Sequence, residues 1–179
     1  MRLIGIAAAL AFVATVWAAN YAVEHWGVVS VGFGLTAPAG VYFAGLAFTL
    51  RDIVHRALGR WVVIAAILVG AALSYWVSDA VTLEGGLVSL AVASGFAFLI
   101  SELSDLAVYE PIRGRGWTVA VLASNITGIL VDSALFLWLA FGSLSFFEGQ
   151  VVGKAWMTLA ALPIVLLIRR VPFERPAVV

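Results

Sequence analysis

The sequence predicts an all-α integral membrane protein: six transmembrane helices in one bundle, with both termini in the cytoplasm. Of the 179 residues, 64% are hydrophobic and only 11% are charged. A soluble domain is nearer to half apolar and a quarter charged, so the composition predicts the class. Basic residues gather in alternate connections between apolar runs, and this pattern predicts the topology. We expect residues 1–179 to form a single transmembrane domain.

Composition also excludes several classes of function. The formal net charge is zero, so no basic patch is available to bind nucleic-acid phosphates. The chain has no cysteine, which excludes disulfides, thiolate catalysis and cysteine-ligated metals. Its two histidines, His25 and His55, do not form a metal-binding motif. We therefore expect no enzyme activity, no cofactor, no metal and no nucleic-acid partner.

Six apolar segments suit transmembrane helices, each of which needs about 20 residues to cross the hydrocarbon core. The first follows Arg2 and is longer than the apolar region of a signal peptide, so we interpret it as a membrane helix. Thr36 and Pro38 supply start signals for the second, and Gly59 supplies its stop. The predicted spans are residues 3–23, 38–58, 61–77, 87–109, 117–141 and 150–168.

Local sequence also predicts where two of the spans end and identifies one shorter apolar stretch. Pro111 is expected to end the fourth span, and Arg169 and Arg170 close the sixth. The stretch 27–35, GVVSVGFGL, is apolar and glycine-rich but too short to span a bilayer. We expect it to be a re-entrant or interfacial segment.

The positive-inside rule orients the bundle. Nine of the ten basic residues lie at the ends of spans that would face the cytoplasm, and acids occupy the opposite ends. We interpret the arginines of the two inner connections as topology determinants with no part in binding: Arg51, Arg56, Arg60, Arg113 and Arg115. The tenth basic residue, Lys154, is a candidate counter-charge for acids inside the membrane.

Two acids lie deep in the fourth span, where each costs about 2.5–3.5 kcal/mol at a helix centre. Helical spacing places Glu102, Asp105 and Tyr109 on one face. Something must satisfy these carboxylates, and we expect their face to line a polar cavity within the bundle. The competing interpretation is a buried hydrogen-bonded network that only holds helices together.

The fifth span carries a second polar face, formed by Asn125, Gly128 and Asp132. At about 1.5 Å of rise per residue, Asn125 lies roughly 15 Å in from Arg115. Glu102 lies at a similar depth, so the two should meet at one level on adjacent antiparallel helices. Gly128 would let another backbone or a flat ligand approach closely.

The second span adds Thr49 and Asp52 to the candidate site. Asp52 and Arg56 stand at i and i+4, so they could pair with each other, and function and structure are equally good accounts of Asp52. Aromatic rings would stack on a flat ligand, and the sequence does not select among the candidates Phe33, Tyr42 and Trp76.

Three motifs resemble the VUT family of vitamin-uptake or queuosine-precursor transporters. They are APAGVYFAGLAFTLRDIVHRALGR at 37–60, SELSDLAVYEPIR at 101–113 and SNITGILVDSALF at 124–136. They lie in the order and spacing of that family and cover much of the chain from the second span to the fifth. The resemblance implies a six-helix importer of 7-deazaguanines such as preQ0 or preQ1 in the bacterial inner membrane.

Carried over residue by residue, the resemblance implies a substrate-binding set. It points to Asp52 in TLRD, to Glu102 and Asp105 in SELSD, and to Asn125 and Asp132 in SNITGILVD; Thr49 joins them from the polar face of the second span. The expected partners are the small-molecule substrate and the lipid bilayer, and self-association into a homo-oligomer is left open.

Three rival functions differ in class. The first is a substrate-binding membrane subunit for another vitamin-like molecule; since the sequence has no P-loop, a separate ATPase would drive it. The second is an intramembrane enzyme that uses Glu102 and Asp105 as a carboxylate pair, which the lack of a nucleophile and of ligating histidines disfavours. The third is a purely structural membrane protein.

Overall fold

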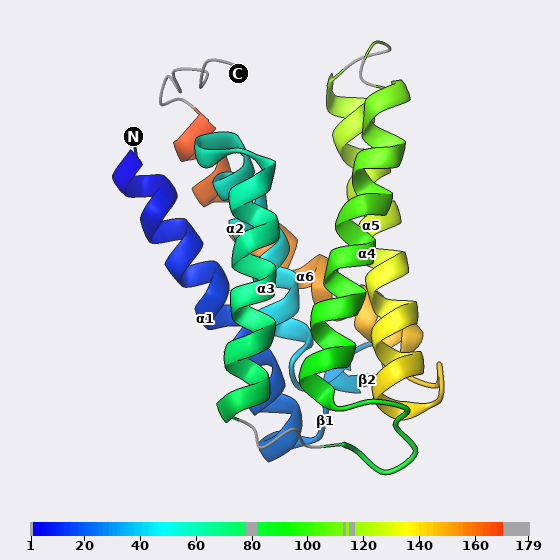
Figure 1. Ribbon diagram of the computed structural model, residues 1–179. Helices are drawn as coiled ribbons and strands as arrows, with labels where there is room; N and C mark the ends of the chain where they lie inside the picture. Colours follow the sequence, from blue (N-terminus) through cyan, green and yellow to red (C-terminus); the bar gives the residue numbers. More distant parts are fainter. Residues whose placement is uncertain (1, 78–81, 113, 115–116, 170–179) are drawn as a thin grey trace.

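The computed structural model describes residues 2–77, 82–112, 114 and 117–169. In this part of the chain six helices follow one another, with one two-stranded hairpin between the first and the second (Figure 1). The elements are α1 (Arg2–Trp26), β1 (Val28–Gly32), β2 (Leu35–Pro38), α2 (Val41–Leu58), α3 (Arg60–Val77), α4 (Leu90–Ile112), α5 (Trp117–Phe141) and α6 (Phe147–Arg169). Each of the six predicted apolar segments therefore forms a helix.

The β-hairpin corrects the all-α prediction, while the interpretation of 27–35 as a re-entrant or interfacial segment stays a prediction. Strands β1 and β2 pair antiparallel, with Val28 opposite Pro38 and Ser30 opposite Thr36. Phe33 and Gly34 both have positive φ, 53° and 74°, which is the backbone that closes tight hairpins. Because Pro38 belongs to β2, α2 begins later than predicted, at Val41.

The boundaries of α4 also differ from the prediction of 87–109. The helix begins at Leu90, and the residues before it form a loop whose backbone N–H groups at Leu87 and Val88 bond to the carbonyl of Leu139 in α5. At its other end it continues through Pro111 to Ile112. A proline this close to a helix end removes one backbone donor from the last turn, which is a small loss.

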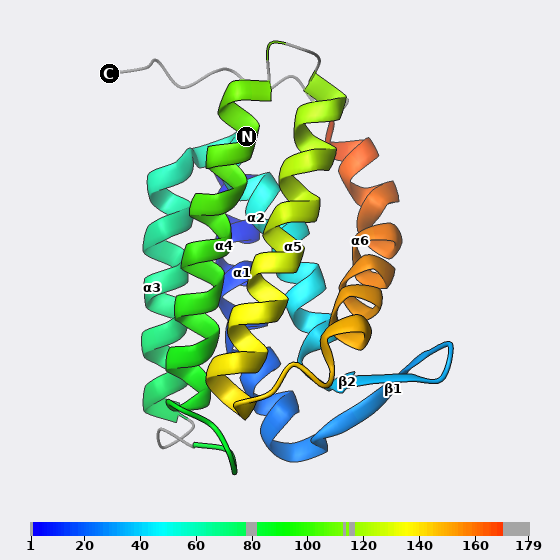
Figure 2. The same cartoon turned by 90° about the vertical axis from the view of Figure 1, so that its right-hand side faces the viewer.

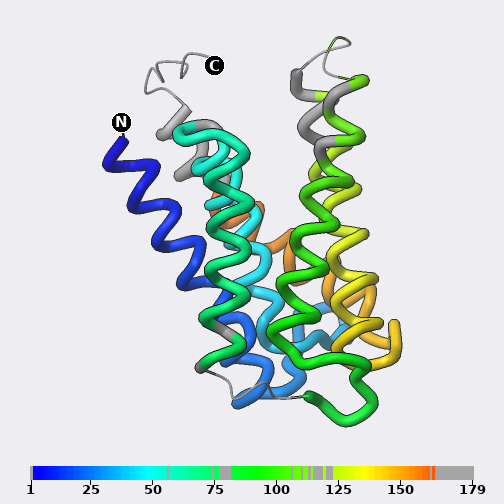
Figure 3. Tube along the Cα trace, in the orientation of Figure 1, coloured from blue at the N-terminus to red at the C-terminus, as the bar shows by residue number. Residues whose placement is uncertain are grey.

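The helices run alternately up and down the bundle (Figure 3). α1 begins and α6 ends at one end of the molecule, and the β-hairpin lies at the other end beside α6 (Figures 1 and 2). α4 and α5 pack mainly on each other, whereas α2 packs on α1 and α6. We call the two helices α4 and α5, with their connection, the α4–α5 pair. It meets the rest of the bundle chiefly along α3 and α6.

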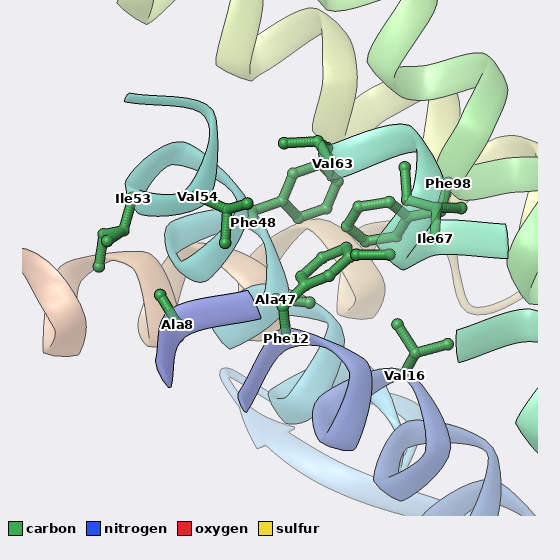
Figure 4. Close-up of a cluster of buried hydrophobic side chains, with 11 residues drawn as sticks. Ala8, Phe12, Val16, Ala47, Phe48, Ile53, Val54, Val63, Ile67 and Phe98 are labelled. Carbon is green, nitrogen blue, oxygen red and sulfur yellow. The ribbon is translucent and has the colours of Figure 1, made fainter. Parts of the chain in front are cut away.

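The largest apolar cluster lies where α1, α2, α3 and α4 meet (Figure 4). Phe98 of α4 stacks on Phe48 of α2 with ring centroids 4.9 Å apart. Phe12 of α1 meets the Phe98 ring edge-on at 5.5 Å. Offset stacks and edge contacts of this kind each add about 0.5–1.5 kcal/mol beyond area burial. This aromatic contact joins the α4–α5 pair to the other helices.

Three helices have the length and composition of membrane spans, in the part of the chain that the structure describes: Arg2–Trp26, Leu90–Tyr109 and Ala123–Phe141. The apolar part of α3, Arg60–Leu73, is shorter. Large apolar side chains such as Leu3, Leu68 and Trp76 are exposed on the outside of the bundle, as they would be against lipid. The count of six spans and the orientation of the termini stay predictions.

Candidate functional site

A buried arginine, Arg51 of α2, holds the polar residues of three helices together. Its Nη1 lies 2.5 Å from Oε2 of Glu102 on α4. Its Nη2 donates to Oδ1 of Asn125 on α5 at 3.2 Å. Only 2% of the Arg51 side chain and 2% of the Glu102 side chain is exposed. Glu102 and Asn125 therefore do lie at one level on adjacent helices, as their depth in the sequence predicts.

Two further acids complete what we call the Arg51 cluster. Asp52 Oδ1 accepts hydrogen bonds from Nε and Nη2 of Arg51, at 3.1 and 2.7 Å. Asp105 Oδ2 lies 3.9 Å from Nη1, and Asp105 Oδ1 is buried with no hydrogen-bond partner among the described residues. The Asp52 side chain is 43% exposed, so the cluster runs from the protein interior to the surface.

The interpretation of Arg51 as a topology determinant alone is wrong, since the side chain is buried and bonded on several sides. The sequence did contain a signal. Glu102 and Asp105 require a positive partner at their depth, and Arg51 is the basic residue furthest from the end of α2. The side chain of Arg56 lies outside the described residues, so the predicted pair of Asp52 with Arg56 stays a prediction.

Aromatic and small residues frame the guanidinium of Arg51. Its Cζ lies 5.4 Å from the centroid of the Phe48 ring, within the range of a cation–π contact. Gly128 of α5 faces the same ring: a Cβ atom there would lie 3.7 Å from Cε1 of Phe48 and 3.8 Å from Cβ of Asp105. These are ordinary van der Waals distances, so another backbone does not approach Gly128 closely, contrary to the prediction. The approach of a flat ligand at this glycine stays a prediction.

A second buried ion pair joins α5 to α6. Lys154 Nζ donates to Oδ2 of Asp132 at 2.6 Å and to Oγ of Ser133 at 2.8 Å. Only 1% of the Lys154 side chain is exposed. Lys154 is thus a counter-charge to an intramembrane acid, as predicted, and its acid is Asp132. Asp132 lies at the end of the site away from Arg51. Along α5 it is about 10 Å from Asn125, at 1.5 Å per residue.

Several candidates lie apart from the Arg51 cluster. Thr49 is buried on α2, and in the described part of the chain it makes no hydrogen bond or ion pair with the cluster. Phe33 and Trp76 are exposed, and the hydroxyl of Tyr42 donates to the carbonyl of Ser30 in the β-hairpin. The ring at the cluster is that of Phe48, which is not among the predicted stacking residues.

The arrangement has more acceptors than donors. Among the described side chains of the cluster, with all groups ionised, three carboxylates face one guanidinium, an excess of two negative charges. Buried carboxylates accept strongly from N–H groups, and the amide of Asn125 can both donate and accept. A cluster of this kind suits a ligand that brings N–H donors or a positive charge.

Comparison with known proteins identifies the family. The model of the family described as "putative vitamin uptake transporter" matches residues 38–168, which include every residue of the Arg51 cluster together with Asp132 and Lys154. No curated protein and no solved structure matches the chain. The match spans well over half of the sequence, from β2 to the end of α6, so the chain belongs to the putative vitamin uptake transporter family.

Proposed function

We propose that this protein imports a flat heterocyclic queuosine precursor, a 7-deazaguanine such as preQ0 or preQ1, across the bacterial inner membrane. The family supports a transporter role. The observation that carries the substrate class is the buried Arg51 cluster, with its excess of carboxylates and the unpartnered Oδ1 of Asp105. Six membrane spans with cytoplasmic termini would place this cluster on the inner half of the path.

The chemistry of a 7-deazaguanine fits these groups. Its guanine-like edge offers adjacent N–H donors, which one carboxylate accepts together. Its carbonyl can accept from the Asn125 amide, and its flat ring can lie against Phe48. A buried carboxylate also rejects analogues that lack the donors, because its own lone pairs would then go unmet. In this proposal Glu102, Asp105 and Asn125 bind the base, and Asp52 and Asp132 mark the two ends of its path.

The charge excess of the cluster predicts a preference between the two precursors. preQ1 carries an aminomethyl group that is cationic at neutral pH, whereas preQ0 carries a neutral nitrile. A cation placed near carboxylates that outnumber their counter-charge, in a site of low polarity, is stabilised more than a neutral group. We therefore expect preQ1 to bind more tightly than preQ0.

The test is thermal stabilisation of the purified protein by purines and 7-deazaguanines, followed by uptake of radiolabelled preQ1 into proteoliposomes. A ligand of the folded state raises the melting temperature by mass action. In Glu102→Gln we expect the affinity for preQ1 to fall at least about tenfold, since a charge-assisted hydrogen bond contributes about 1.5–3 kcal/mol. Glu24→Gln, the same change at an exposed acid of α1, is the matched control and should bind normally.

Two outcomes would overturn the proposal. Binding and uptake that survive Glu102→Gln combined with Asn125→Ala would remove the Arg51 cluster from the substrate site. Stabilisation by preQ1 without uptake by this chain alone would instead favour a binding subunit that needs a separate ATPase.

A further inference from the structure

A small, mostly apolar cavity with one polar wall lies on the other side of the Phe48–Phe98 stack from Arg51. It measures about 30 Å³, and residues of α1, α2, α4, α5 and α6 line it. Its polar lining residues are Ser94, Asp132 and Gln150, and its aromatic ones are Phe98 and Phe136. A volume of this size has room for about two water molecules. We call it the Gln150 cavity.

The polar wall of the Gln150 cavity has an acceptor with no partner. Gln150 is 2% exposed, and its Oε1 has no hydrogen-bond partner among the described residues. Leaving a buried acceptor unsatisfied costs about 1–3 kcal/mol, so a donor is expected to reach it in some state of the protein. Gln150 and Lys154 stand at i and i+4 on α6, and Lys154 holds Asp132 on the same wall.

One aromatic contact separates this cavity from the Arg51 cluster. Phe98 lines the cavity and stacks on Phe48, and the guanidinium of Arg51 lies over the Phe48 ring. Figure 4 shows the two rings side by side, one from α2 and one from α4. On α5 the same order holds: Asn125 bonds to Arg51, Gly128 faces Phe48, and Asp132 lines the cavity.

We propose that the Gln150 cavity is a second binding station for the transported heterocycle, on the side of the molecule that carries the β-hairpin. This inference rests on the function proposed above. A flat base with N–H donors would donate to Oε1 of Gln150 and lie between Phe98 and Phe136. The Phe48–Phe98 stack is then the barrier between this station and the Arg51 cluster.

The Gln150 cavity must enlarge before it can bind the heterocycle. A bicyclic base is several times larger than two water molecules, so the α4–α5 pair must move away from α2 and α6 to admit it. Hydrogen bonds and ion pairs of two cations, Arg51 and Lys154, cross this boundary. Opening at the hairpin side requires Lys154 to part from Asp132 or to move with it.

The absence of cysteine from the chain makes a direct test clean. Ser94→Cys places one thiol in the cavity wall, and Ala93→Cys places one in the neighbouring apolar core of α4. In vesicles of known orientation, we expect a membrane-impermeant maleimide to modify Ser94→Cys from the hairpin side. Saturating preQ1 should slow this reaction several-fold, and Ala93→Cys should not react.

A second pair of variants keeps the proposal testable if Ser94→Cys does not fold. Gln150→Leu removes the acceptor and should raise the KM for preQ1 uptake about tenfold, while equilibrium binding at the Arg51 cluster in detergent changes little. Gln150→Glu retains an acceptor and should restore a KM near that of the natural protein. A matching loss in the two variants would indicate a packing role and overturn the proposal.

The two proposals fail in different ways. If the natural protein neither binds nor takes up any 7-deazaguanine, the proposed function itself is wrong. If uptake is normal but preQ1 does not protect Ser94→Cys, and Gln150→Leu keeps its KM, the transporter stands and the second station is excluded.

Discussion

Arg51 makes more of the polar contacts in the site than any other described side chain. A guanidinium offers five N–H donors in a fixed plane, and here these reach Asp52, Glu102 and Asn125 on three helices. A lysine has one nitrogen and could not reach three partners in this geometry. Burying such a charge is costly, and the acids around it offset that cost only while the set is complete.

Removing the cation is therefore expected to destabilise the fold strongly. Arg51→Met leaves Glu102 and Asp105 buried without a positive partner, a loss of about 3–5 kcal/mol. For a chain of this length that lowers the melting temperature in detergent by about 10 °C. Arg60→Met, at an exposed arginine that contacts the Trp61 ring, should change it by only a few degrees.

A double variant separates charge from packing. Arg51→Met with Glu102→Met removes both members of the closest pair, so it should melt above Arg51→Met alone. If Arg51→Met melts at the same temperature as the natural protein and the control Arg60→Met, the buried network does not form in the purified protein.

For single residues, the sequence predicts the positions of the buried acids better than it predicts their basic partner, Arg51. Helical spacing and depth suffice to bring Glu102 and Asn125 to one level. The arginine was misjudged because basic residues near helix ends usually mark topology, and one sequence does not say which of several neighbouring arginines turns inward. Only the tertiary arrangement, which brings Arg51 of α2 within hydrogen-bonding distance of Glu102 and Asn125, selects it.

Two glycines show how closely the helices approach one another. A Cβ atom at Gly45 of α2 would lie 2.8 Å from Cβ of Met157 and 2.9 Å from Cα of Lys154 on α6. At Gly128 the nearest atom would be 3.7 Å away, an ordinary contact. The first glycine sets the α2–α6 distance at the level of Lys154, whereas the second leaves room for a methyl group.

A glycine-to-alanine substitution should thus destabilise the protein more at Gly45 than at Gly128. Gly45→Ala must push α6 away from α2 and is expected to cost about 1–3 kcal/mol. Gly128→Ala should change stability by less than about 1 kcal/mol. Melting temperatures of the two variants in one detergent give the comparison, and equal losses would contradict the close contact of α2 with α6.

Long apolar segments predict secondary structure well, whereas short ones do not. The range of α5 agrees with the predicted 117–141, because a long apolar run has few alternatives. The β-hairpin was missed because nine apolar and glycine-rich residues fit several structures. Its register depends on pairing between Val28 and Pro38, which no local pattern reveals.

For the whole molecule, the positive-inside rule makes an orientation prediction that labelling can check. Ser145 lies between α5 and α6 on the side of the β-hairpin, and Gly114 lies between α4 and α5 at the other end. We expect an impermeant maleimide to label Ser145→Cys in intact cells and Gly114→Cys only after the membrane is permeabilised. The reverse pattern would invert the bundle and exchange the inner and outer sides of the path.

The position of Arg51 along the chain also constrains how the protein is made. Its partners Glu102 and Asn125 lie 51 and 74 residues later, so a ribosome needs several seconds more to supply them. Until then Asp52 is the one acid of the cluster beside the guanidinium, and α2 is not among the candidate membrane spans found in the described residues. Stable membrane insertion of α2 should therefore wait for the α4–α5 pair, and a nascent chain released before α4 emerges would be a substrate for quality-control proteases.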